Sequence, residues 1–117
     1  MNVVLLRGTL SRPPTARDLP SGDQLVALEV TTRPPEGRAE SVPVAWVGAP
    51  ARVLRYQAGD EVVVTGRIRR RFFRAGGATA SRTEVVADAV WPAGQRARSA
   101  RAVARALEGV DAPAPSA

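Results

Sequence analysis

Residues 66–77, "GRIRRRFFRAGG", combine two residue types that together can bind a nucleic-acid strand. The segment holds five arginines, two adjacent phenylalanines and a closing pair of glycines. Guanidinium groups neutralise phosphates, and an aromatic ring accepts any base because every base has a π surface. The pattern therefore predicts a surface that follows a phosphate backbone and stacks a base.

Strand alternation divides this segment between two faces, because successive side chains of a strand point to opposite sides. We expect the core face to carry Val62, Val64, Gly66 and Ile68. The opposite face then carries Val63, Thr65, Arg67, Arg69, Arg71 and Phe73. We assign Phe72 to the interior and Phe73 to the ligand face. A second interpretation stays open, in which the arginines only guard a strand edge against aggregation and either phenylalanine belongs to the core.

The overall composition favours a polyanionic partner and argues against catalysis. The chain has 117 residues and a net charge of +6, and all of its 17 basic residues are arginine. Cysteine and histidine are absent, which excludes disulfides, thiolate zinc sites and the usual general base. We therefore expect no enzyme, no catalytic residues, no metal site and no cofactor. Nucleic acid is the first partner such a charge suggests, and an anionic membrane surface is the second.

Four carboxylates offer a different chemistry. Asp60, Glu61, Glu84 and Asp88 could in principle hold a divalent metal. A simpler interpretation places the first two in a helix–strand loop and the other two on a strand where they can pair with arginines. No apolar stretch is long enough to cross a bilayer, and the start of the chain does not resemble a signal peptide. We expect a cytoplasmic, nucleoid-associated protein.

The elements that hold the arginine strand follow from alternation and turn residues. Strands are expected at residues 1–10, 23–32, 41–47, 60–73 and 82–91, with loops at 11–22 and 33–40 and a turn at 74–81. A short helix is expected within residues 48–60, where Pro50 suits the first turn and Gly59 the C′ position. Gly8 indicates a bulge or a close backbone approach, and Pro43 indicates an edge or a bulge. Five strands with this helix between the third and fourth describe an all-β OB-fold barrel.

The character of the chain changes after Trp91 and Pro92. Residues 93–110 have helical periodicity, with an apolar face and a basic face: Val103, Leu107 and Val110 on the first, Arg98, Arg101 and Arg105 on the second. The last residues, "DAPAPSA", are expected to be disordered. We therefore expect a binding domain at residues 1–92 and a basic tail at residues 93–117. Whether that tail is a docked helix or unstructured stays open.

Three segments resemble the bacterial single-stranded DNA-binding protein (SSB) family. They are the opening "MNVVLLRGTLSRPPTARDLPSG", the strand "VVVTGRIRRRFF" and the strand "RTEVVADAV". The resemblance implies an OB fold, usually in a homotetramer, that wraps single-stranded DNA in replication, recombination and repair. It carries over Arg69, Arg71 and Phe73, the last at a position where the family has tryptophan. It also suggests Trp46 near an aromatic of the third strand, and we place Trp46 on the DNA face with a core position as the alternative.

The departures from the family pattern keep other functions open. Arg33 and two prolines stand where the family has a tryptophan, and the acidic C-terminal tip that recruits replication and repair proteins is missing. We expect arginine to carry more of the affinity, and the DNA contacts are expected at Arg7, Arg33, Trp46, Arg67, Arg69, Arg71, Phe73 and Arg74. This points to a divergent paralogue that forms a tetramer or a dimer. The alternatives are a primosomal-type OB-fold adaptor, which binds a replication protein and DNA only weakly, and an RNA-binding OB protein.

Overall fold

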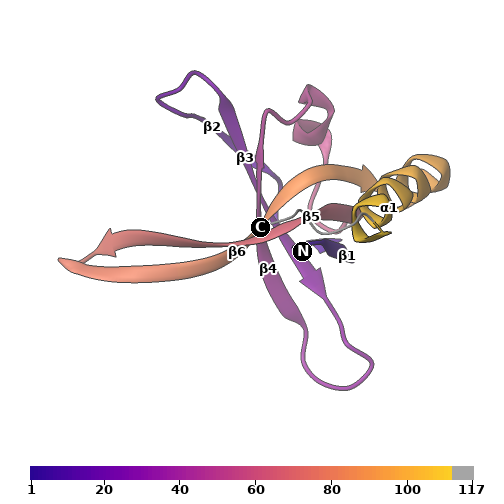
Figure 1. The fold of residues 1–117 in the computed structure, drawn as a ribbon, viewed down its shortest axis with the longest axis horizontal. Coiled ribbons are helices and arrows are strands. Elements are labelled where there is room, and N and C mark those ends of the chain that lie inside the picture. Colours follow the sequence, from indigo (N-terminus) through magenta and orange to yellow (C-terminus); the bar gives the residue numbers. More distant parts are fainter. Residues whose placement is uncertain (112–117) are drawn as a thin grey trace.

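A computed structural model describes residues 1–111, and strands make up most of it (Figure 1). The elements in chain order are β1 (Val4–Leu10), β2 (Thr15–Asp18), β3 (Gln24–Thr32), β4 (Glu40–Val47), the 3₁₀ helix η1 (Ala51–Arg55), β5 (Glu61–Ala75), β6 (Ala78–Pro92) and α1 (Arg96–Asp111). The predicted disorder of the C-terminal end falls on residues 112–117, outside the described residues, apart from Asp111 at the end of α1.

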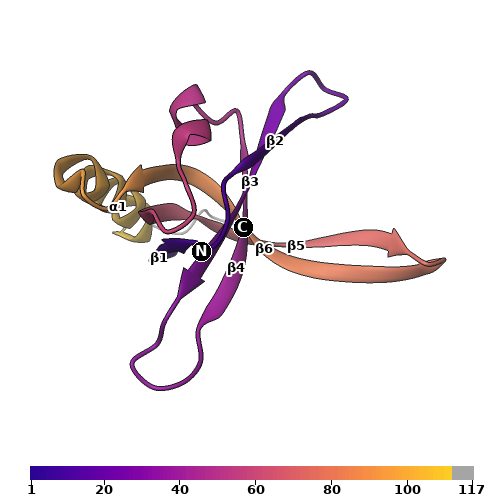
Figure 2. The same ribbon diagram turned by 180° about the vertical axis from the view of Figure 1, so that it is seen from behind.

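The strands form one sheet that closes on itself. Their order is β1-β5-β6-β4-β3-β2, and β1 also pairs with β3 where Thr9 faces Thr31. β4 and β6 run parallel, and every other pair among the described strands is antiparallel. This arrangement, with η1 between β4 and β5, confirms the predicted OB-type barrel. The hairpins β2–β3, β3–β4 and β5–β6 project away from the barrel (Figure 2).

The loop predicted at residues 11–22 was partly wrong, because it contains β2. This strand pairs with β3 from Thr15 opposite Ala27 to Asp18 opposite Gln24. All four residues of β2 are exposed, so no apolar alternation marks it in the sequence. It exists because the backbone groups along that side of β3 find hydrogen-bonding partners there.

An aliphatic cluster fills the barrel. Its buried members are Leu10, Val26, Leu28, Val30, Val44, Trp46, Val53, Val62, Val64, Val85, Ala87 and Val90. Full burial of one such valine or leucine contributes about 1.5–3 kcal/mol, which decides which face of each strand points inward. β3 follows the predicted alternation, since Val26, Leu28 and Val30 are buried whereas Ala27 is exposed.

Trp46 belongs to this core, so its expected place on the DNA face was wrong. Its exposure is 6%, and it shares the inward face of β4 with Val42 and Val44. The indole is too large and apolar to be left in water when a neighbouring core can take it. The alternative, a core position, is the one observed.

The β5–β6 hairpin extends well beyond the barrel. Its strands pair from Val62 opposite Pro92 out to Ala75 opposite Ala78. The tip consists of Gly76 and Gly77, whose φ angles are both positive, as a two-residue hairpin turn requires. The turn is therefore much shorter than the predicted residues 74–81.

Because no core lies beneath the projecting hairpin, side chains on both of its faces are exposed. Phe72 is 67% exposed and Ile68 is 50% exposed. The prediction that Phe72 is an interior residue was therefore wrong. Alternation identified its side of the strand correctly, but the barrel ends before that side reaches Phe72.

Gly8 and Gly66 lie where the backbone of a neighbouring strand comes close, and Pro43 lies at a local strand edge. A Cβ on Gly8 would collide with the carbonyl oxygen of Thr31, which confirms the close approach expected there. Gly66 is equally tight against Val86, next to a bulge in the β5–β6 ladder. Pro43 faces a partner in β3 only, because the pairing of β4 with β6 begins at Val44. The proline thus occupies a local edge, one of the two positions predicted.

α1 is an ordered helix that lies against the outer side of β5 and β6 (Figure 1). The hydroxyl of Ser99 donates to the carbonyl oxygen of Pro92 at 3.1 Å. The guanidinium of Arg98 lies 4.8 Å from the ring centre of Trp91. The docked form of the predicted basic helix is therefore the one observed. Among the described residues, no helix has the length and apolarity needed to span a membrane.

Candidate nucleic-acid interface

A groove crosses the outer side of the barrel where the β5–β6 hairpin leaves it. We call it the hairpin groove, and its volume is about 290 Å³. Its lining residues are Thr15, Arg17, Leu25, Ala27, Leu28, Pro43, Val44, Ala45, Arg71, Arg82 and Glu84. The floor is therefore made of apolar side chains from β3 and β4, among them the small residues Ala27, Pro43 and Ala45, while arginines from β2, β5 and β6 lie at its sides. OB-fold barrels bind oligonucleotides on this face, beside the loop that joins their last two strands.

Two of the predicted arginines converge on one buried carboxylate. A side-chain nitrogen of Arg69 donates to Glu84 Oε1 at 2.7 Å, and Arg71 Nε lies 3.8 Å from the same oxygen. The side chain of Glu84 is only 7% exposed, whereas those of Arg69 and Arg71 are 43% and 41% exposed. The carboxylate therefore lies below the surface and holds two guanidinium groups that remain open to a ligand. The prediction that Glu84 can pair with arginines is confirmed.

An aromatic ring lies next to this arginine pair. Phe73 is 39% exposed, and the Arg71 guanidinium carbon lies 5.6 Å from its ring centre. Arg67, Arg69, Arg71 and Phe73 alternate along β5 on the face turned away from the core. The structure therefore brings Arg69, Arg71 and Phe73 together, and Arg67 precedes them on the same face of the strand.

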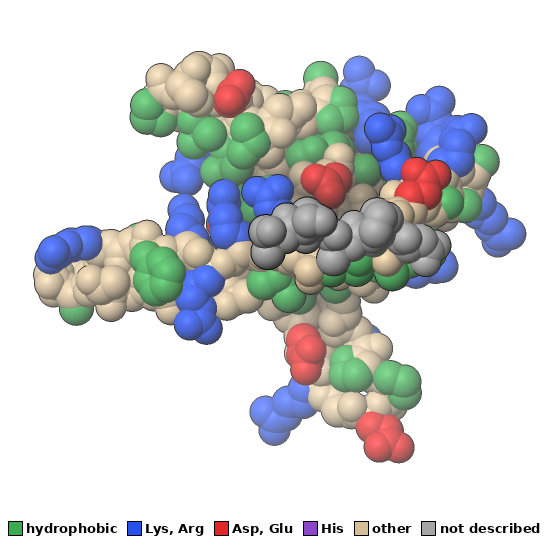
Figure 3. Space-filling model, viewed as in Figure 1, with side chains coloured by type: hydrophobic (Ala, Val, Ile, Leu, Met, Phe, Trp, Pro, Cys, Tyr) green, Lys and Arg blue, Asp and Glu red, His purple; other side chains and the backbone are tan. Residues whose placement is uncertain are grey.

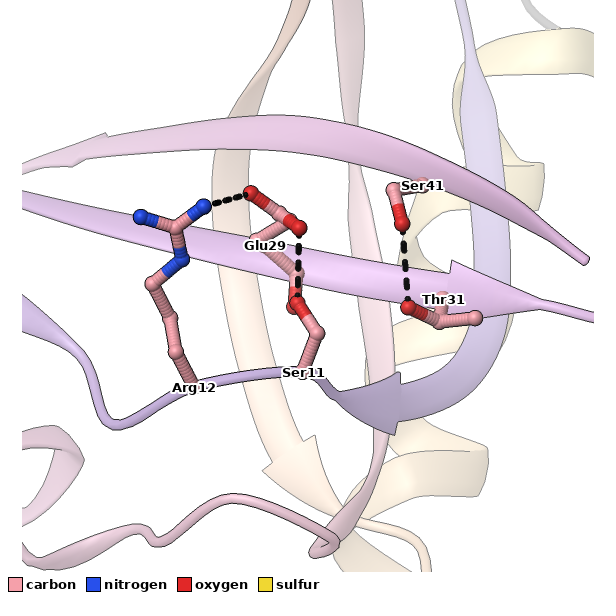
Figure 4. A network of polar contacts seen from close by, with 5 residues as sticks. All are labelled: Ser11, Arg12, Glu29, Thr31 and Ser41. Atoms are coloured by element: carbon pink, nitrogen blue, oxygen red, sulfur yellow. Dashed lines mark hydrogen bonds and ion pairs between the residues drawn. The ribbon is translucent and has the colours of Figure 1, made fainter.

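A polar network adjoins the hairpin groove, because Glu29 of β3 faces the groove residue Pro43 of β4. Glu29 accepts hydrogen bonds from Ser11 at 2.9 Å and from Arg12 at 2.5 Å (Figure 4). The Ser11 hydrogen bond is the main cause that lowers the pKa of Glu29; desolvation offsets part of this effect, and the positive charges of Arg12 and Arg82 lower the pKa further. Glu29 therefore stays ionised and remains in an ion pair with Arg12. Thr31 and Ser41 share a hydrogen bond further along the same strands.

Basic side chains gather over two parts of the molecular face that is seen in Figure 3. Figure 3 shows them along the β5–β6 hairpin and over α1, with acidic side chains between them. The arginines of the hairpin greatly outnumber the acids there, since Glu84 is the only acidic residue in the sequence from Arg67 to Ala87. A polyanion approaching the hairpin therefore meets a positive surface.

The remaining predicted contacts lie apart from the hairpin groove. Arg7 is on β1, where it forms an ion pair with Glu61 at 2.6 Å. Arg33 is exposed in the connection between β3 and β4, and Arg74 lies near the hairpin tip on the side of Phe72. Trp46 is in the core, as described above. The structure thus brings together Arg69, Arg71 and Phe73, with Arg67 on the same face.

Two groove residues, Arg17 and Arg82, were not predicted from the sequence. Arg82 faces Arg71 across the hairpin, and this pairing could have been found by counting outward from the glycine turn. Arg17 lies on β2, whose polar sequence gives no strand signal. Its approach to the groove depends on the pairing of β2 with β3, which only the folded barrel reveals.

The four carboxylates that could have formed a metal site are spread over different surroundings. Glu61 pairs with Arg7 and Glu84 with Arg69. Asp60 accepts a hydrogen bond from the backbone of Gln57 in the turn before β5. In residues 1–111 no group of three or more acidic side chains is placed to hold an ion.

The part of the chain that forms the barrel matches a known protein family. The model of the "Single-strand binding protein family" matches residues 1–92 of the chain. The match therefore covers β1 to β6, including both strands of the projecting hairpin, and ends before α1. No curated protein matches the chain.

Proposed function

The chain belongs to the single-strand binding protein family, and from this membership we propose that it binds single-stranded DNA through the hairpin groove and the outer face of β5. Binding is independent of base sequence and serves replication, recombination or repair in the cytoplasm, at the nucleoid. It involves no catalysis and no cofactor.

One observation carries this proposal: the pair Arg69 and Arg71 is held on buried Glu84 beside the exposed ring of Phe73. The two guanidinium groups contact phosphates, because their outward-facing N–H groups are unoccupied by the single carboxylate between them. Phe73 stacks on a base, and its ring accepts any of the four. Arg67 extends the phosphate contacts along the same face of the hairpin, whereas Arg74 lies on the face of Phe72.

The floor of the groove accommodates sugars and bases by shape. Ala27, Pro43 and Ala45 are small, so a flat ring can approach the backbone of β3 and β4 closely. Arg17 and Arg82 then reach the phosphates from either side. Aromatic stacking is sparse in this chain, where aromatic residues make up 4%, and arginine accordingly supplies most of the affinity.

We further propose that the protein assembles into a homo-oligomer, a tetramer or a dimer. Members of the family typically oligomerise. Residues 4–8 of β1 pair with β5 on one side only within the described part of the chain, and Leu5 is 41% exposed beside this edge. An open strand edge with apolar side chains is a suitable surface for a second copy.

The function is tested by competition. A labelled single-stranded DNA oligonucleotide bound to the full-length protein is displaced with unlabelled single-stranded DNA, duplex DNA and RNA of equal length. We expect single-stranded DNA to compete best, because only an unpaired strand offers both its phosphates and its base faces to the groove. Preference for RNA would support the RNA-binding alternative, and weak binding to all three would support the adaptor.

A further inference from the structure

Helix α1 lies outside the part of the chain that matches the family, yet it contributes a basic surface. The match ends at residue 92, and α1 spans Arg96–Asp111. Its arginines are Arg96, Arg98, Arg101 and Arg105, and all four are exposed. Their distribution around the helix shows which of them can serve a ligand.

The two long sides of α1 face different strands. On one side Arg96, Val103 and Leu107 line a largely apolar groove shared with Leu5 and Arg7 of β1. On the other side Arg98, Arg101 and Arg105 line a separate groove of about 290 Å³ with Ala89 and Trp91 of β6. Three of the four arginines therefore lie on the β6 side of the helix.

The docking of α1 against β6 holds Arg98 in place and fixes the position of the helix. Arg98 and Arg52 both lie over the indole of Trp91, at 4.8 Å and 3.5 Å from its ring centre. Arg52 also donates to the carbonyl oxygen of Val90 at 2.8 Å. Trp91 thus joins η1, β6 and α1, and the helix presents its arginines at a fixed position.

The guanidinium groups of Arg101 and Arg105 are unpaired within the described part of the chain. Neither forms an ion pair or a side-chain hydrogen bond with the residues that the structure describes. Two acidic groups share this surface: Glu108 follows Arg105 by three residues on α1, and Asp88 lines a neighbouring groove together with Arg105. Both guanidinium groups are therefore available to an anion.

The surface of α1 and the surface of the hairpin lie on the same face of β5. The helix covers Val63 and Thr65 near the start of the strand, and Arg67, Arg69 and Arg71 follow them by alternation. Figure 3 shows basic side chains over both parts. A strand leaving the hairpin groove along this face reaches the arginines of α1 after it passes the acidic side chains that lie between the two basic surfaces.

We propose that Arg98, Arg101 and Arg105 form a second phosphate-binding stretch, which extends the path of single-stranded DNA from the hairpin onto α1. The inference rests on the proposed function, and it adds a site that the family match does not include. The helix binds the backbone only, because its β6 side offers guanidinium groups and a Trp91 ring that is already covered by arginine. Longer oligonucleotides therefore gain affinity from α1, and short ones do not.

The test compares arginines on the two sides of the same helix in the full-length protein. Arg101→Ala and Arg105→Ala are matched with Arg96→Ala, which removes the same charge from the β1 side. For a long oligonucleotide, the slope of log affinity against log salt is expected to fall by about 0.7 for each phosphate that the variant no longer neutralises. We expect this fall in Arg101→Ala and Arg105→Ala but not in Arg96→Ala. Circular dichroism confirms that each variant keeps its helix.

The outcomes separate this inference from the proposed function. If all three variants show the same fall in slope, or none does, α1 provides no specific path and the inference is wrong, even though the wild-type protein still binds. If the slope falls equally with the shortest oligonucleotide that binds, the strand does not reach α1 by way of the hairpin, and the inference is again wrong. If the wild-type protein fails to bind single-stranded DNA at all, the proposed function itself is wrong.

Discussion

At the scale of single residues, Glu84 is the unusual feature of the interface. A carboxylate in a surface meant for phosphates should repel DNA, yet this one is buried beneath Arg69 and Arg71. Its burial keeps it away from the ligand, and its contacts restrict two long side chains that would otherwise lose conformational entropy on binding. We interpret Glu84 as a positioning residue for the two arginines.

Replacing Glu84 with glutamine distinguishes positioning from charge neutralisation. The change raises the net charge by one, which alone would strengthen binding. We expect weaker binding to single-stranded DNA, by about 1 kcal/mol, because the substitution removes a charged hydrogen bond that orients Arg69. Fluorescence anisotropy measures the effect. The matched control is Glu61→Gln, which removes the same charge from the Arg7 pair on β1; tighter binding by both variants would show that Glu84 only neutralises charge.

The two adjacent phenylalanines should behave differently on substitution. Phe73→Ala is expected to reduce the binding free energy by about 1–3 kcal/mol, the usual value for one stacked base, and to leave the salt slope unchanged. Phe72→Ala should change neither binding nor the free energy of unfolding by more than about 0.5 kcal/mol, because Phe72 is 67% exposed on the other face. An equal reduction of affinity in both variants would mean that DNA wraps around the hairpin.

At the scale of elements, alternation and turn residues predicted the strands well but not how far they extend. β3 has the faces expected from its sequence, since burial of valine and leucine decides them. β5 shows the expected core face at Val62 and Val64, but Ile68, also expected there, is 50% exposed and Thr65 of the opposite face is buried. The positions of Phe72 and Trp46 could not be predicted in this way. A strand pattern states which side a residue occupies, whereas the presence of a core on that side depends on the closure of the whole barrel.

The candidate site was predicted on one strand and missed on its neighbours. Arg69, Arg71 and Phe73 were found because they lie in one continuous segment. Arg17 and Arg82 come from other strands, and their approach depends on pairing between elements that are distant in sequence. Arg7, also expected at the interface, lies apart from the hairpin groove on β1 and forms an ion pair with Glu61 of β5.

Removing α1 tests how the helix relates to the barrel. We expect a chain without residues 95–117 to stay folded and to unfold cooperatively, since the family match and the aliphatic core both end before the helix. Its melting temperature should fall, because Trp91 and Thr65 are then uncovered, and its DNA affinity should fall because Arg98, Arg101 and Arg105 are removed. Thermal unfolding followed by circular dichroism measures the first effect. A truncated chain without a cooperative transition would show that α1 is part of the core.

At the scale of the whole molecule, the open edge of β1 predicts assembly. We expect light scattering at micromolar concentration to give four times, or else twice, the mass of the 12.4 kDa chain. Leu5→Glu should reduce the mass, because it places a charge on the apolar surface beside that edge. A wild-type mass equal to one chain would contradict the proposed oligomer.

The central claim is that single-stranded DNA lies on the β5–β6 hairpin and in the groove at its base. Hydrogen–deuterium exchange of the full-length protein, with and without a saturating single-stranded oligonucleotide, locates the bound strand directly. We predict slower exchange in residues 67–74 and 79–83, where the hairpin is otherwise open to solvent, and unchanged exchange in residues 51–56 around η1. Saturated binding that leaves the hairpin unprotected while slowing exchange elsewhere would contradict the account.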